Sequence, residues 1–117
     1  MASGPTIYHI CRNDEWQAAV AAGLYPGSSQ DAADGFIHFS TAGQVADSAA
    51  RHRAGQAGLV LVAVAADGLG PALKWECSRQ GALFPHLYGP LPRAAVRWVR
   101  ELPLDAAGRH VFPPLDE

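Results

Sequence analysis

Lysine is almost absent from this chain, which has a single lysine, Lys74, and eight arginines spread along the sequence. The formal net charge is -2. Proteins that bind the phosphate backbone of nucleic acids need clustered lysine and arginine side chains. We therefore expect no non-specific binding to nucleic acid, whereas a local arginine pocket for one phosphate is compatible with this composition.

Cysteine is scarce, and long hydrophobic runs are missing. Cys11 and Cys77 are too few for a disulfide scaffold and suit a reducing cytoplasm, and we expect both to be core thiols on strands. The longest apolar run, Gly58 to Ala66, has about half the length needed to cross a bilayer. The start of the chain does not resemble a signal peptide. We expect a soluble, cytoplasmic protein with no membrane partner.

The common active-site motifs are absent as well. No CxxC, HxxxH or HExxH spacing occurs, so no metal ion is expected. Ser40 lies in "FSTAG", which lacks the first glycine of the G-x-S-x-G motif of hydrolases. No Walker or GxGxxG loop is found, because "DGLGP" (Asp67 to Pro71) ends in proline where a helix should begin.

The composition is that of a globular protein, with 49% hydrophobic and 17% charged residues. A chain of 117 residues is long enough for one core, so we expect residues 1–117 to form a single domain. Strands and helices are predicted without a steady βαβ rhythm. This pattern favours an α+β fold over a doubly wound parallel sheet.

Two helices are predicted from their capping residues and apolar spacing. The first has Asn13 as its N-cap and ends at Gly23, where a C′ glycine belongs. The second has Thr41 as its N-cap, with Gln44 at the capping-box spacing, and ends at Gly55. The segment between the two helices contains a loop and a short strand.

Strands are predicted where β-branched and aromatic residues alternate or cluster. The run Leu59–Val64 is continuous and apolar, so we expect a central strand that is buried on both faces. Pro26–Gly35 is a loop by composition, and Phe84–Pro92, with three prolines, is expected to be neither helix nor inner strand. The other predicted strands are Thr6–Cys11, Phe36–Ser40, Ala72–Cys77 and part of Ala94–Leu102, with Gly108–Pro114 as an edge strand or tail.

One stretch, "DGFIHFSTAGQV" (Asp34–Val45), has more polar residues than burial or a turn requires. His38 stands among apolar residues, where a polar ring needs a partner. Ser40 and Thr41 stand where a strand leads toward a helix N-terminus, whose N–H groups favour an anion. This unit therefore predicts a site for a ligand with phosphate or ribose hydroxyl groups.

Four further residues are candidates for the same site. His9 and Glu76 lie on predicted strands, and His86 and Tyr88 lie in a proline-rich and aromatic segment that would form a pocket wall. Each also has a structural interpretation. His9 is then a half-exposed strand residue, Glu76 a solvated one, and the other two brace a rigid loop. Thr41 is an N-cap in either interpretation.

Four motifs in order, "IYHI", "DGFIHFSTAGQV", "LKWE" and "FPHLYGPL", resemble the bacterial and plant family known as domain of unknown function 952. The resemblance extends over roughly Thr6 to Pro113. It implies a fold similar to that of ADP-ribosyltransferases, in which a split, curved mixed sheet with two main helices holds NAD in a cleft. NAD or a related nucleotide is then the expected ligand, as a substrate.

The wider resemblance to ADP-ribosyltransferases also implies roles for single residues. His9 would contact the NAD ribose, Phe39 or His38 would support the nicotinamide ring, and Glu76 would stabilise the ribosyl cation. The sequence departs from the transferase pattern in the second motif, which has no tyrosine. No set of arginines matches the RNA 2′-phosphotransferase branch.

Three hypotheses about function follow. The first is an enzyme, or former enzyme, of the ADP-ribosyltransferase-like class, with His38 and Glu76 as catalytic residues. The second is a non-catalytic module that binds a small molecule on the same scaffold. The third is a hydrolase in which His38 and Ser40 act together as an acid–base pair, for which no third, orienting residue is evident.

Overall fold

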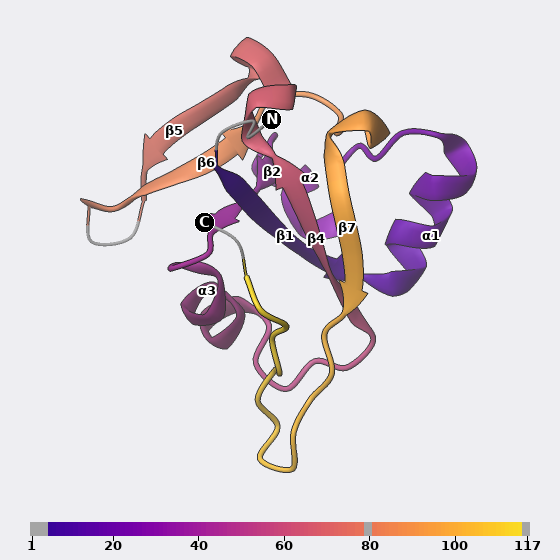
Figure 1. Ribbon diagram of the computed structural model, residues 1–117, viewed down its shortest axis with the longest axis vertical. Coiled ribbons are helices and arrows are strands. Elements are labelled where there is room, and N and C mark those ends of the chain that lie inside the picture. Colours follow the sequence, from indigo (N-terminus) through magenta and orange to yellow (C-terminus); the bar gives the residue numbers. More distant parts are fainter. Residues whose placement is uncertain (1–4, 79–80, 116–117) are drawn as a thin grey trace.

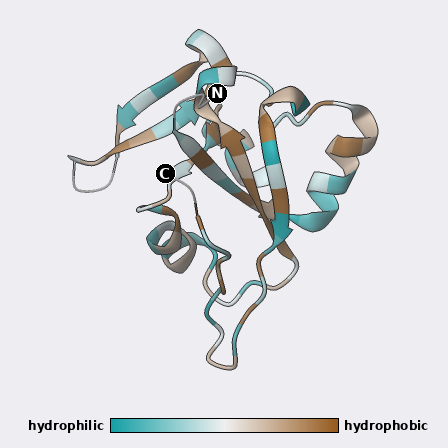
Figure 2. Cartoon of the chain, viewed as in Figure 1, coloured by the Kyte–Doolittle hydropathy of each residue, from teal (hydrophilic) through white to brown (hydrophobic). Residues whose placement is uncertain are grey.

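β4 (Leu59–Ala65) is the central strand of the fold. The computed structural model, which describes residues 5–78 and 81–115, places β4 between β1 (Thr6–Arg12) and β7 (Val96–Glu101) (Figure 1). β3 (Ser40–Thr41) completes this four-stranded sheet on the far side of β1. The first six residues of β4 are buried, because alternate side chains enter clusters on opposite faces of the sheet. The prediction of a central strand buried on both faces is confirmed, and Figure 2 shows the hydrophobic character of this strand.

A second, three-stranded sheet contains β2 (Ile37–His38), β6 (Leu83–Leu87) and β5 (Leu73–Cys77), with β6 in the centre. The prediction that Phe84–Pro92 holds no inner strand is therefore wrong. Pro85 is accommodated where β2 ends, because its carbonyl accepts a hydrogen bond of 3.0 Å from Phe39 N–H and proline has no N–H to return one.

The predicted strand Phe36–Ser40 is divided between the two sheets at Phe39. β2 pairs with β6, whereas β3 pairs with β1 through Ile7 and Tyr8. The single-sided pairing at Pro85 gives a physical reason for the break. Every pairing between the described strands is antiparallel, so the expectation of a mixed sheet is wrong and the α+β class is confirmed.

α1 (Asn13–Ala22) has Arg12 as its N-cap, so Asn13 is the first helical residue and not the cap. The helix ends as predicted at Gly23, whose φ of 84° is left-handed. Trp16 and Ala19 of this helix are buried against one face of the four-stranded sheet, in the same apolar cluster as alternate side chains of β4.

α3 (Val45–His52) covers the opposite face of the four-stranded sheet through Val45. Its N-cap is Gln44, and its C-cap is Arg53, two residues before Gly55. The prediction of Thr41 as the N-cap is wrong, because Thr41 pairs with Ile7 in β3 and the chain must turn before the helix begins. Half of the capping box remains, since Thr41 N–H donates to Gln44 Oε1 at 3.0 Å.

A short helix, α2 (Ser29–Ala32), lies in the segment predicted to be a loop. Ser28 and Asp31 form a capping box, in which each side chain accepts a hydrogen bond from the backbone of the other. Gly27 leads into it with a φ of 110°, and a Cβ at this position would lie 3.2 Å from both Asp31 Cβ and Ile37 Cγ1. Glycine is thus needed here for its conformation and for its size.

The remaining segments connect the sheets and end the chain. η1 (Ala66–Ala72) leads from β4 to β5, η3 (Arg93–Ala95) leads into β7, and a tail with a bridge between Leu104 and His110 follows. Among the described residues, no helix is long and apolar enough to cross a membrane.

The two cysteines differ in their surroundings. Cys11 is fully buried in β1, where burial raises the pKa of its thiol to about 11, so its prediction as a core thiol is confirmed. Cys77 is exposed, and the same prediction for it is wrong. The reason is that β5 is an edge strand of a hairpin that projects from the body of the protein (Figure 1).

Candidate functional site

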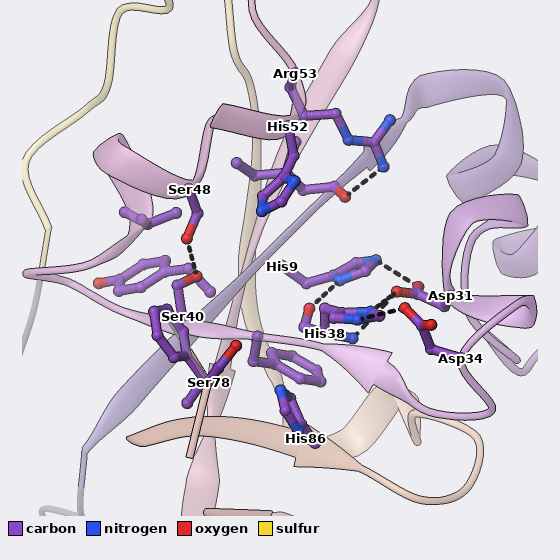
Figure 3. A pocket seen from close by; sticks show the side chains of 15 residues that line it. His9, Asp31, Asp34, His38, Ser40, Ser48, His52, Arg53, Ser78 and His86 are labelled. Atoms are coloured by element: carbon purple, nitrogen blue, oxygen red, sulfur yellow. Dashed lines mark hydrogen bonds and ion pairs between the residues drawn. The ribbon is translucent and has the colours of Figure 1, made fainter. Parts of the chain in front are cut away.

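A cavity of about 220 Å³ lies where the two sheets separate. β3 pairs with Ile7 and Tyr8 of β1, and this pairing ends before His9. Tyr8, His9 and Ile10 are the residues of β1 that line the cavity. α3 and β6 contribute the other walls. The polar side chains around the cavity, drawn in Figure 3, are His9, Asp31, Asp34, His38, Ser40, Ser48, His52, Arg53, Ser78 and His86.

His38 lies between two carboxylates, and its side chain is 43% exposed. Its Nδ1 donates to Asp31 Oδ1 at 2.6 Å, and its Nε2 lies 3.0 Å from Asp34 Oδ2, within ion-pair distance. A carboxylate beside each ring nitrogen favours the imidazolium form, in which both nitrogens carry a proton. The hydrogen bond to Asp31 is the main reason why the pKa of His38 is raised above its usual value of 6.5. With His38 protonated, the Asp31–His38–Asp34 cluster has two negative charges and one positive charge.

Asp31 organises this part of the site. Its carboxylate accepts hydrogen bonds from Ser28 N–H at 2.7 Å, from Ser28 Oγ at 2.9 Å and from His38 N–H at 3.1 Å, besides the imidazole bond. Burial acts to raise the pKa of this carboxyl, but the hydrogen bonds from His38 and from backbone N–H groups outweigh it and lower the pKa to about 2. Asp31 is therefore a carboxylate throughout the ordinary pH range.

His9 is 2% exposed, which differs from the half-exposed position weighed for it above. Its Nδ1 donates to the His38 carbonyl at 2.6 Å, and its Nε2 accepts a hydrogen bond of 2.7 Å from the Tyr25 hydroxyl. Burial lowers the pKa of His9, so the ring is neutral and this pair of bonds defines its tautomer. His9 thereby ties the β2–β3 segment to β1.

Replacing Tyr25 by phenylalanine is expected to lower the free energy of unfolding by about 1 to 3 kcal/mol, because it leaves the buried His9 Nε2 without a hydrogen-bond partner. Urea denaturation measures the change. Tyr88→Phe is the control, since Tyr88 is exposed and its loss is expected to change stability by less than about 0.5 kcal/mol. Equal stability of the two variants would contradict the role assigned to the Tyr25 hydroxyl.

His86 lies opposite His38, in the register of β6 with β2. Its Nδ1 donates to Glu76 Oε1 at 2.8 Å, which also accepts a hydrogen bond of 2.7 Å from the Tyr88 hydroxyl. The bonds from Tyr88 and His86 lower the pKa of Glu76. Phe36 stacks on His86, with ring centroids 4.1 Å apart, and contacts His38 at 4.5 Å. With Nδ1 occupied, Nε2 is the nitrogen that His86 offers to the cavity.

The predicted site residues are only partly brought together. The Ser40 hydroxyl donates to Ser48 Oγ at 3.0 Å, and Phe39 is buried against His9 at a centroid distance of 5.5 Å. The predicted residues on the cavity wall are His9, His38, Phe39, Ser40 and His86. Those outside it are Thr41, Glu76 and Tyr88, of which Glu76 reaches the cavity through His86.

Several residues of the wall were not predicted. Asp31 had a sequence signal, because Ser28 and Asp31 stand at the capping-box spacing. Ser48 and His52 are four residues apart and share one face of α3. Arg53 had no local signal, since its contact with Ile10 joins residues 43 positions apart. Within residues 5–78 and 81–115, no group of three or more His, Cys, Asp or Glu side chains is placed to hold a metal ion.

Solved structures of protein CC0527 from Caulobacter crescentus resemble this fold. The crystal structure of that protein has 51% sequence identity to this chain. The alignment covers 91% of this chain and 93% of that chain, with a TM-score of 0.87. The solution NMR structure of the same protein has 52% sequence identity to this chain. The alignment covers 89% of this chain and 90% of that chain, with a TM-score of 0.79. The family described as "Protein of unknown function (DUF952)" matches residues 10–99. A comparison with curated proteins finds no match.

Proposed function

Because the chain belongs to the DUF952 family of proteins of unknown function, we propose its function from the site: an ADP-ribosyltransferase-like enzyme that binds NAD or a related nucleotide in the cavity. The observation that carries this proposal is the Asp31–His38–Asp34 cluster on the wall of a cavity between two sheets. The ADP-ribosyltransferase-like fold is part of the same proposal.

The size of the cavity limits how NAD would lie. Pockets for drug-sized ligands usually have about 300 to 1,000 Å³, and this cavity has about 220 Å³. It therefore takes one ribose with the group attached to it, and the rest of the dinucleotide lies on the surface. Ser40 and Ser48 present hydroxyl groups suited to a ribose or a phosphate, and the half-exposed ring of His38 contacts the nicotinamide end.

The chemistry uses the net charge of the cluster. Breaking the bond between ribose and nicotinamide leaves the electron pair on nicotinamide and positive charge on the ribose. With His38 protonated, the two carboxylates and the imidazolium have a net charge of -1, which stabilises this positive charge. The acceptor oxygen then bonds to the ribose carbon, and its proton passes to His86 Nε2, while Glu76 holds Nδ1 as a positioning residue.

A binding module without catalysis is the second candidate. It is favoured by the internal hydrogen bonds of His9 and Ser40, whose polar atoms already have protein partners. The hydrolase hypothesis gains Asp31 as an orienting residue for His38, but the Ser40 hydroxyl donates to Ser48. The nucleotide enzyme therefore remains our first proposal.

Titration with NAD, followed by amide and imidazole NMR, tests the proposal. We expect the signals of His38, Ser40 and Ser48 to shift together and to saturate, because these residues line the cavity. The amides of α1 serve as the control, since α1 contributes no residue to the wall. Nicotinamide release is then measured on the same sample. The absence of any shift at millimolar NAD would refute nucleotide binding.

A further inference from the structure

Arg53 is a buried cation on the cavity wall. The residue is 7% exposed and follows the last turn of α3. Its two hydrogen bonds go to neutral acceptors, from Nη1 to Gln56 Oε1 and from Nη2 to the Ile10 carbonyl, each at 3.3 Å. In the part of the chain that the structure describes, no carboxylate oxygen lies within 4.0 Å of its guanidinium.

A buried guanidinium is costly unless its charge is compensated. The Ile10 carbonyl and the negative end of the α3 dipole give Arg53 partial compensation. Two hydrogen bonds use two of the five N–H donors of a guanidinium, so donors remain for a further acceptor. An anion that enters the cavity would supply both the acceptors and the missing charge.

The acidic side chains nearby form ion pairs with residues other than Arg53. Asp31 and Asp34 both bind His38, and Asp47 pairs with Arg51 on the exposed side of α3. Figure 3 shows Arg53 and His52 on one side of His9 and His38, with His86 on the other side. The cavity thus has a cationic end at Arg53, separate from the Asp31–His38–Asp34 cluster.

We infer that Arg53 binds a phosphate-type oxyanion of the ligand at this end of the cavity. A guanidinium can donate two parallel hydrogen bonds to one phosphate, and His52 lies next to Arg53 on the cavity wall (Figure 3). The inference rests on the proposed function in that one cavity holds the ligand, and it adds that the ligand has a phosphate next to the group bound near His38. It requires no catalytic step.

Two ligands that differ by one phosphate test the inference, nicotinamide mononucleotide and nicotinamide riboside, together with inorganic phosphate alone. We expect the mononucleotide to bind at least about tenfold more tightly than the riboside. We also expect Arg53→Gln to abolish this difference, and Arg53→Lys to keep only part of it because lysine lacks the planar fork. Arg51→Gln is the matched control on the exposed side of α3.

The outcomes separate this inference from the proposed function. Equal affinity for the mononucleotide and the riboside would overturn the phosphate subsite and leave nucleoside binding intact. If neither binds while inorganic phosphate binds in an Arg53-dependent manner, the subsite stands and the NAD proposal fails. Absence of phosphate binding at low salt would overturn the subsite. Amide spectra of each variant show whether it is folded, and Arg53→Lys replaces Arg53→Gln if the latter is not.

Discussion

Replacing Asp31 by asparagine is expected to lower the free energy of unfolding by about 3 kcal/mol, because several hydrogen-bond donors lose a buried, charged acceptor. The carboxylate accepts hydrogen bonds from Ser28 and His38 through backbone and side-chain donors. An amide group has one oxygen and an NH₂ that cannot accept, so part of these donors loses its partner. Urea denaturation at pH 7 measures the loss.

The same substitution should change the pH dependence of stability. The raised pKa of His38 stabilises the wild-type protein fully below pH 6.5, and this contribution is lost as the pH rises through the pKa of the folded state. The lowered pKa of Asp31 contributes stability above its usual value of 3.8, which is lost as the pH falls toward about 2. In Asp31→Asn, both pH-dependent contributions should shrink, and imidazole NMR should show a lower pKa for His38.

Asp34→Asn is the matched control for this prediction. Its carboxylate also binds His38, but the side chain is 56% exposed, so we expect a loss of no more than about 1 kcal/mol. If Asp31→Asn and Asp34→Asn are equally stable, Asp31 is not the residue that organises the site. An unchanged pKa of His38 in Asp31→Asn would likewise contradict the cause given for its shift.

Elements with a regular local pattern could be predicted from the sequence. The apolar run of β4 and the alternation of β1 depend on side-chain periodicity, which the sequence states directly. The break at Phe39 depends on Pro85, which lies 46 positions later in β6. No local sequence pattern therefore predicts the break. The misplaced start of α3 has a similar origin, because the pairing of Thr41 with Ile7 overrides its capping preference.

The candidate site follows the same rule. His38 was found because a polar ring among apolar residues needs a partner, but the partners themselves, Asp31 and Asp34, lie in a segment that composition alone assigned to a loop. Arg53 is buried only because the end of α3 packs on the edge of β1. Residues brought together by tertiary contacts between distant segments leave no spacing in the sequence, and they form most of the wall.

Glu76→Gln is expected to lower the rate of nicotinamide release by about 100- to 10,000-fold while NAD affinity stays unchanged. Glu76 lies outside the cavity wall and accepts a hydrogen bond from His86 Nδ1, which leaves Nε2 free to take the proton of the acceptor. A glutamine amide can donate to Nδ1 instead and so favours the wrong tautomer. The effect should therefore appear in kcat and not in KM, with a changed pH–rate profile.

Tyr88→Phe is the control for Glu76→Gln, because it removes the other hydrogen bond to Glu76 and keeps the carboxylate that orients His86. We expect it to retain most of the wild-type rate. Wild-type turnover in Glu76→Gln would refute the positioning role of Glu76. A wild-type protein that binds NAD and releases no nicotinamide would identify the cavity as a binding module, since the hydrogen bonds of the Asp31–His38–Asp34 cluster would then stabilise the fold without acting on a ribosyl cation.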